Sequence, residues 1–212
     1  MKVDAHISRV SAKVRDGALH RHDGGRYGGG SAFAVAFGLG LPRTWRISTD
    51  SVLSGFEQGL AASPRRGGDR LKDAYTACRE SLSASAEALI ERAIPDAAFV
   101  AVLVDAGQLH VTATGPVRVY LHRRGKARRL TDRNEDPRGM LGGSSMTINL
   151  ALEPADIVLL GSASAFSAKA IDKLASVLEA DHDAPPAVIA SLLTEPAAQA
   201  GAGAAAVVFR VR

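Results

Sequence analysis

The chain has 212 residues, 46% hydrophobic and 23% charged, and this balance allows residues 1–212 to form one domain with a substantial buried core. Its 26 Lys and Arg residues against 22 Asp and Glu give a net charge of +4, which is typical of a mixed solvated surface rather than of a nucleic-acid interface. The single cysteine, Cys78, excludes an intrachain disulfide framework and a cysteine-based zinc cluster.

The N-terminus lacks the apolar run of a signal peptide, and no later stretch approaches the ~20 apolar residues of a membrane span. We therefore expect a cytoplasmic protein that does not associate with a membrane.

Glycine-rich residues 24–31 precede the first predicted strand. They resemble a phosphate-binding loop, but Gly30 stands where that loop requires lysine, and a strand rather than a helix is predicted to follow. This segment therefore predicts a flexible surface hairpin or a disordered loop.

The first half of the chain predicts one strand and two helices. The apolar run 31–37, bounded by glycines, indicates a buried strand. A helix should begin at Ser48 or Thr49, whose hydroxyls can cap free amides, and end near Ser63. Asp69 can cap a second helix, whose apolar face consists of Leu71, Ala74, Tyr75, Cys78, Leu82, Leu89 and Ile90. Each helix has one apolar stripe, so both should pack against a sheet.

After Pro95 the pattern changes to short apolar runs and alternation of period two. Strands are predicted over 99–105, 108–114, 117–123, 127–130, 147–152, 157–160 and 205–211, and helices over 168–178 and 186–193. Short turns between successive strands indicate antiparallel pairing. The predicted class is therefore α+β with antiparallel sheets.

The basic run 122–129 could contact phosphates of nucleic acid or of a phosphoprotein. However, it lies at a predicted hairpin tip, no aromatic residue interleaves with the charges, and Asp132, Glu135 and Asp136 follow at once. A solvated hairpin is the preferred interpretation, and nucleic-acid binding through residues 123–129 remains a third alternative.

Four segments together resemble a known family. They are 34–40 (AVAFGLG), 115–121 (GPVRVYL), 130–131 (LT) and 156–164 (DIVLLGSAS). In this order and spacing they are similar to motifs of the metal-dependent serine/threonine phosphatases of the 2C type, which have Asp-Gly-Met-Gly-Gly, Gly-Asp-Ser-Arg, Leu-Thr, Ser-Asp-Gly and C-terminal Asp-Asn elements. The resemblance implies a four-layer α-β-β-α sandwich over nearly the whole chain.

The resemblance also implies that the metal site is degenerate. Such enzymes bind two Mg²⁺ or Mn²⁺ ions through carboxylates and use a metal-bound water to attack phosphate. The positions of those acids correspond here to Phe37, with Gly38 kept for the turn, to Ala163, and to Gly203 and Ala204. We therefore expect no metal cofactor, and a Phe37 ring that fills the emptied site, with Ala163 opposite leaving room for it.

One carboxylate of the site is a candidate survivor. Asp23 stands at a suitable distance before Phe37, although a loop residue is the preferred interpretation. Arg21 is a candidate for contacting phosphate. If the chain were an active Mn- or Mg-dependent phosphatase, its unorthodox ligands would come from Asp23, His20, His22 or Asp132.

The segment 132–143 is short where the family often inserts a mobile flap. Together these features predict a catalytically inactive relative that acts as a protein-binding or regulatory module in phosphorylation-linked signalling. The expected partner is a protein, such as a kinase or a phosphoprotein.

Overall fold

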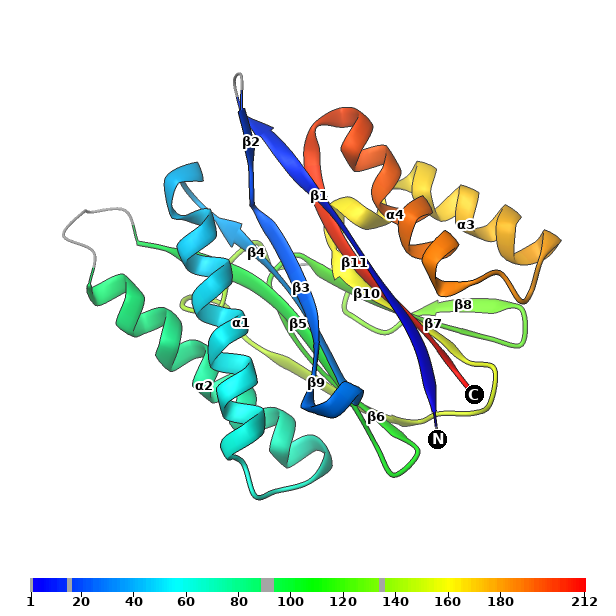
Figure 1. Ribbon diagram of the computed structural model, residues 1–212, viewed down its shortest axis with the longest axis horizontal. Helices are drawn as coiled ribbons and strands as arrows, with labels where there is room; N and C mark the ends of the chain where they lie inside the picture. Colours follow the sequence, from blue (N-terminus) through cyan, green and yellow to red (C-terminus); the bar gives the residue numbers. More distant parts are fainter. Residues whose placement is uncertain (1, 15–16, 89–93, 134–135) are drawn as a thin grey trace.

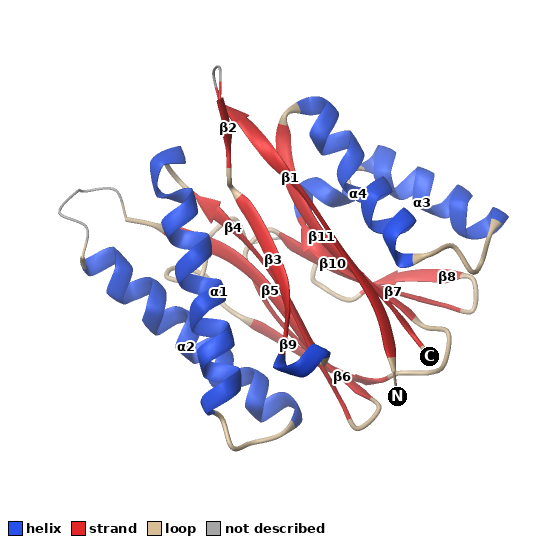
Figure 2. Ribbon diagram, in the orientation of Figure 1, coloured by secondary structure: helices blue, strands red, loops and turns tan. Residues whose placement is uncertain are grey.

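The computed structural model describes residues 2–14, 17–88, 94–133 and 136–212. Two antiparallel sheets lie face to face, and a pair of helices covers the outer side of each (Figures 1 and 2). This arrangement confirms the predicted α+β class and the four-layer α-β-β-α sandwich.

The first sheet contains both ends of the chain. In spatial order its strands are β2 (Gly17–Leu19), β1 (Val3–Val14), β11 (Ala202–Val211), β10 (Ile157–Ser162), β7 (Val117–Arg123) and β8 (Lys126–Arg129). The second sheet has the order β3 (His22–Tyr27), β4 (Ala32–Leu39), β5 (Asp96–Asp105), β6 (Gln108–Thr114) and β9 (Met146–Ala151). The N-terminal and C-terminal strands, β1 and β11, are direct neighbours, paired from Val3 with Val211 to Ala12 with Ala202.

Helices α1 (Trp45–Ala62) and α2 (Gly67–Glu87) pack on the outer face of the second sheet. Helices α3 (Ala168–Ala180) and α4 (Pro186–Ala200) cover the first sheet in the same way. Within the described part of the chain, no helix combines the length and the apolar character needed to cross a membrane.

Between the sheets lies an apolar core. Its centre is the contact of Phe33 on β4 with Phe209 on β11, whose fully buried rings stack with their centroids 5.0 Å apart. The inner side chains of both sheets surround this pair, so most of each inner face is removed from water.

The N-terminal region differs from the sequence prediction. Residues 24–31 were expected to form a flexible hairpin or a disordered loop, but Gly24 to Tyr27 belong to β3 and are paired with β4. A turn at Gly28–Gly30 connects the two strands. The glycines have a packing role, because a Cβ on Gly24 would lie 2.8 Å from the carbonyl oxygen of Ala34.

Helix boundaries also differ. Helix α1 begins at Trp45 rather than near Thr49, and the hydroxyls of Ser48 and Thr49 donate to carbonyls one turn earlier instead of capping the helix. Helix α2 begins at Gly67, so Asp69 lies in its first turn and is not the cap. Helix α4 continues past Leu193 to Ala200. Leu89 and Ile90 lie outside the described residues.

Helices α1 and α2 approach each other closely at two glycines. A Cβ on Gly59 would lie 2.7 Å from the Cα of Ala74, and one on Gly55 would lie 2.7 Å from the carbonyl oxygen of Ala77. Since these atoms are backbone, they cannot move aside without shifting the helix.

We therefore expect Gly59→Ala to lower the free energy of unfolding by about 1–3 kcal/mol, although alanine favours a helix over glycine by about 1 kcal/mol. Urea unfolding followed by circular dichroism measures this. Ser54→Ala, at an exposed position of the same helix, is the control and should change stability little. A stabilised Gly59→Ala variant would contradict the close approach.

Candidate functional site

The pairing of β3 with β4 places His22 directly opposite Phe37. Their rings stack with centroids 5.1 Å apart and an interplanar angle of 24°. Phe37 is 5% exposed and His22 6%, so two packed rings fill the space at this position. The aromatic neighbour was missed from the sequence, where His22 was considered as a metal ligand.

Gly203 lies next to His22. It has a left-handed backbone with φ of 71°, and a Cβ there would lie 2.8 Å from Nδ1 of His22. The carbonyl oxygen of Gly203 accepts a hydrogen bond of 2.8 Å from Ser164 Oγ, which lies 2.9 Å from Ser162 Oγ. Ala163 lies between these two serines, at the start of a short 3-10 turn after β10.

Positions far apart in the sequence thus form one continuous cluster, from Phe37 through His22 and Gly203 to the serines that flank Ala163. The ring of Phe37 is covered by His22 and Arg21. That these positions correspond to lost acidic ligands stays a prediction from the resemblance.

Ala204 and Gly38 have packing roles. Ala204 is fully buried against the α3 and α4 layer, whereas its neighbour Gly203 approaches His22 between the sheets. Gly38 was predicted to be kept for a turn. It lies in β4, and a Cβ on it would lie 2.5 Å from the Cα of Trp45, so the close approach of α1 requires glycine there.

Arg21 is fixed next to this cluster. Its Nε donates to the carbonyl oxygen of Gly38 at 3.1 Å, and its guanidinium lies over the rings of Trp45 at 4.6 Å and Phe37 at 5.8 Å. The side chain is half-buried, so its cation lies at the rim of the Phe37 cluster and is partly accessible.

Asp23 is separated from this cluster by the geometry of the strand. It was expected in a loop, but it lies in β3, and successive residues of a strand point to opposite faces. His22 points between the sheets, whereas Asp23 shares its face with Tyr27, which packs toward α1. Its carboxylate binds Arg9 at 2.6 Å and the amide of Gly24 at 2.7 Å.

The remaining candidate ligands are not gathered with His22 either. Both His20 and Asp132 are exposed, and Asp132 lines a small cavity of about 140 Å³ between β6 and the start of β9, together with Asp136 and Thr131. Among the described residues, no three His, Cys, Asp or Glu side chains come close enough together to hold a metal ion.

The donors around Phe37 do not fit a pair of Mg²⁺ or Mn²⁺ ions. Such ions require several carboxylate or carbonyl oxygens. Next to Phe37 the structure has instead an imidazole, a guanidinium and the backbone of Gly203.

Burial makes His22 a neutral group. Its Nδ1 is buried and has no described hydrogen-bond partner. Desolvation, and secondly the positive charge of Arg21, lower the pKa of His22 to about 3. An imidazolium is therefore excluded from this cluster at neutral pH.

This pKa predicts acid sensitivity. An unfolded histidine has a pKa of about 6.5, so below that pH His22 binds a proton in the unfolded chain. In the folded chain His22 stays neutral down to about pH 3. Between pH 7.5 and pH 5 we expect the free energy of unfolding to fall by about 2 kcal/mol from His22 alone. In His22→Phe, which keeps a ring and cannot protonate, this part of the loss should disappear.

The measurement is urea unfolding at both pH values, with His20→Gln, at an exposed position, as the matched control. An equal loss in the native chain and in His22→Phe would contradict the buried neutral imidazole.

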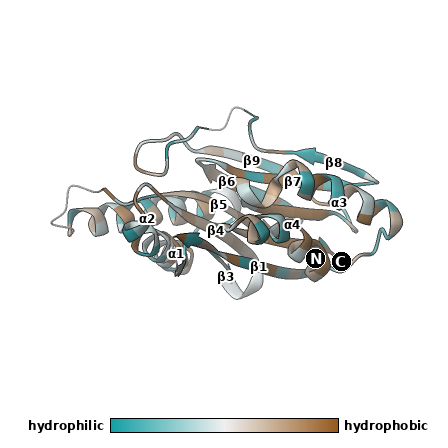
Figure 3. Ribbon diagram, turned by 90° about the horizontal axis from the view of Figure 1, so that it is seen from above, coloured by the Kyte–Doolittle hydropathy of each residue, from teal (hydrophilic) through white to brown (hydrophobic). Residues whose placement is uncertain are grey.

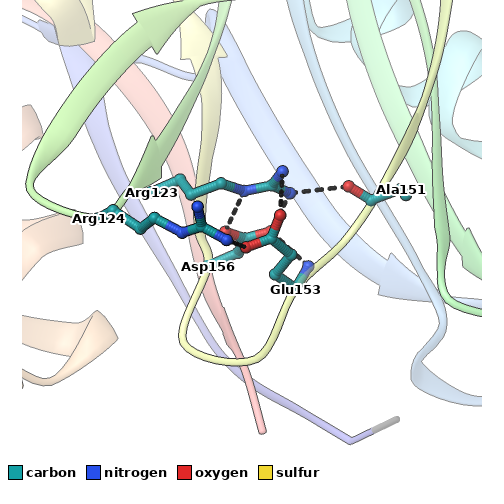
Figure 4. A network of polar contacts seen from close by, with 5 residues as sticks. All are labelled: Arg123, Arg124, Ala151, Glu153 and Asp156. Atoms are coloured by element: carbon teal, nitrogen blue, oxygen red, sulfur yellow. Dashed lines mark hydrogen bonds and ion pairs between the residues drawn. The ribbon is translucent and has the colours of Figure 1, made fainter.

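The basic run forms the hairpin of β7 and β8, with a tip at Arg124 and Gly125. Arg123 donates to both carboxylate oxygens of Asp156, at 2.8 and 2.6 Å, and also binds Glu153 and the carbonyl oxygen of Ala151 (Figure 4). Arg124 binds Glu153 at 2.7 Å. Two cations that had been considered for phosphate contacts are thus engaged in an internal network.

Truncation of Arg123 and truncation of Arg124 should lower the stability by very different amounts. Asp156 is 1% exposed, so Arg123→Ala leaves a buried carboxylate without its cation and should cost about 3–5 kcal/mol of stability. The side chain of Arg124 is 81% exposed, and Arg124→Ala should cost at most about 1 kcal/mol. Thermal unfolding of the two variants measures the difference, and equal losses would show that the network does not depend on burial.

No protein-family model matches the chain, and no curated protein matches it in sequence. Solved structures do match. The catalytic domain of the serine/threonine protein phosphatase PstP in complex with two manganese ions is 18% identical, with a TM-score of 0.80, and 99% of each chain is covered. The PPM Ser-Thr phosphatase MsPP from Mycobacterium smegmatis, in complex with cacodylate, is 21% identical, with a TM-score of 0.77, covering 98% of this chain and 97% of that one.

PppA, a key regulatory component of T6SS in Pseudomonas aeruginosa, is 14% identical with a TM-score of 0.79, covering 100% of this chain and 99% of that one. At these identities the similarity shows the fold alone. The chain therefore has the fold of the 2C-type serine/threonine phosphatases over nearly its whole length, as the resemblance predicted.

Proposed function

We propose that this chain is a catalytically inactive member of the 2C-type phosphatase fold, acting as a protein-binding or regulatory module in phosphorylation-linked signalling in the cytoplasm. The observation that carries the proposal is the stack of His22 on Phe37. Two buried rings lie where the resemblance implies an acidic metal ligand, and His22 is neutral there.

The candidate carboxylate Asp23 does not replace the acidic ligand that the resemblance implies at the position of Phe37. Asp23 is turned to the other face of β3 and is already paired with Arg9. A reaction that needs two cations and a metal-bound water would have to assemble its ligands from side chains that lie apart.

The proposed partner is a kinase or a phosphoprotein. Arg21 is the candidate contact for a phosphate, because Gly38 and Trp45 hold its guanidinium in one orientation and it remains partly accessible. A regulatory role has a precedent in the fold, since PppA is itself described as a regulatory component.

The rival function is an active manganese- or magnesium-dependent phosphatase with unorthodox ligands. We expect no hydrolysis of p-nitrophenyl phosphate or of a phosphothreonine peptide above the rate in buffer with Mn²⁺, and no heat of Mn²⁺ binding in calorimetry. Turnover that is lost both in chelator and in Asp23→Ala would overturn the proposal. Glu57→Ala, at an exposed position of α1, controls for loss of a surface carboxylate.

A further inference from the structure

Strand β9 is the last strand of its sheet. It lies beside β6 and pairs with it on one side (Figure 3). Among the described residues no strand pairs with its other side. An open strand edge can accept a strand from another protein.

The register identifies the free backbone groups of this edge. The amide of Leu152 donates to the carbonyl of Gly107 at 2.9 Å, just beyond the end of the ladder. Hydrogen-bonded pairs alternate in an antiparallel ladder, so Leu150 and Ile148 direct their backbone groups to β6. Thr147 and Asn149 therefore direct their N–H and C=O groups to the open side.

The end of the edge is already occupied. The carbonyl of Ala151 accepts a hydrogen bond of 2.7 Å from Arg123 of the opposite sheet (Figure 4). None of the described hydrogen bonds uses the backbone groups of Thr147 or Asn149, so the available length is the part of β9 before Ala151.

The two faces of β9 differ in chemistry. Met146, Ile148 and Leu150 point inward and pack against the core between the sheets, but they are only partly buried. An apolar side chain of an added strand would complete their burial.

On the outer face, a groove of about 620 Å³ lies between α2 and β9, with Thr147 in its wall. Its charged lining residues are Lys72, Arg79 and Glu80, all exposed, and neither cation has an ion pair among the described residues. With two cations and one carboxylate, the lining has a net positive charge, which favours acidic side chains on this face of an added strand.

The neighbouring open edge is less suitable. Strand β8 has four residues, and three of them are Lys126, Arg128 and Arg129. Short, charged edge strands discourage pairing, whereas β9 has six residues and carries no charge.

We propose that β9 is the docking edge for an extended segment of a partner protein in which apolar and acidic residues alternate. The inference extends the proposed function by locating where a protein partner binds. A second copy of this chain fits less well, because its β9 is uncharged and would leave Lys72 and Arg79 unpaired.

The probes are two labelled synthetic octapeptides, one alternating Val and Glu and the other alternating Val and Lys, followed by fluorescence anisotropy. We expect the Val/Glu peptide to bind and the Val/Lys peptide to bind much more weakly. Lys72→Glu should weaken binding of the Val/Glu peptide. Amide hydrogen exchange at Thr147 and Asn149 should slow when that peptide is bound.

Thr147→Pro removes an outward N–H without removing a bond to β6, and proline is tolerated at such edge positions. We expect it to weaken binding by about tenfold or more, since one hydrogen bond is lost and the added strand is obstructed. Thr147→Val keeps the N–H and is the matched control. If Thr147→Pro does not fold, the hydrogen-exchange result on the unaltered chain decides.

Absent binding, equal binding of the two peptides, or binding with no slowing of exchange at Thr147 and Asn149 would overturn the inference. A dimer of this chain that dissociates in Thr147→Pro would overturn it by assigning the edge to a second copy. Each of these outcomes leaves the proposed lack of phosphatase activity intact, so the two proposals fail separately.

Discussion

The contact between Phe33 and Phe209 joins the two sheets. The rest of the architecture depends on the burial of apolar side chains between these sheets. Each sheet has an apolar inner face, and facing the other sheet removes both from water. Each outer face then needs its own cover, which α1 with α2 and α3 with α4 supply. At the margins of this core, polar groups must either pair, as Arg123 does with Asp156, or lose their charge, as His22 does.

The candidate site is a consequence of that core. Phe37 belongs to the inter-sheet cluster, and His22 extends it toward Gly203 and the serines after β10. The burial that fills this position with rings also lowers the pKa of His22, so the poor fit to hard cations and the expected acid sensitivity have one physical cause. At the other end of the same sheet, no strand among the described residues follows β9, and its inward side chains are only partly buried.

Parts of the fold were predictable because their signals are local. Strands β6 and β7 have the predicted bounds, since alternating residues and tight turns at Ala106 and Arg124 mark their ends. Strand β3 was not predicted, because glycines 24 and 25 suggest a loop. These glycines allow close approach to β4 and to the ring of Tyr27. That role depends on contacts that form only in the folded chain. Likewise, Ser48 was predicted to cap α1, because the sequence does not show that its hydroxyl donates to the carbonyl oxygen of Thr44.

By itself, the sequence determined the α+β class and the antiparallel pairing and, through resemblance, led to the prediction that acidic ligands are replaced at named positions. These depend on residue type, period and order along the chain. Only the tertiary structure decided that His22 stacks on Phe37, that Asp23 faces away from both, and that β9 is the last strand of its sheet among the described residues. The reason is that strand pairing sets which face a side chain occupies and which strand lies last, and pairing joins residues that are distant in the chain.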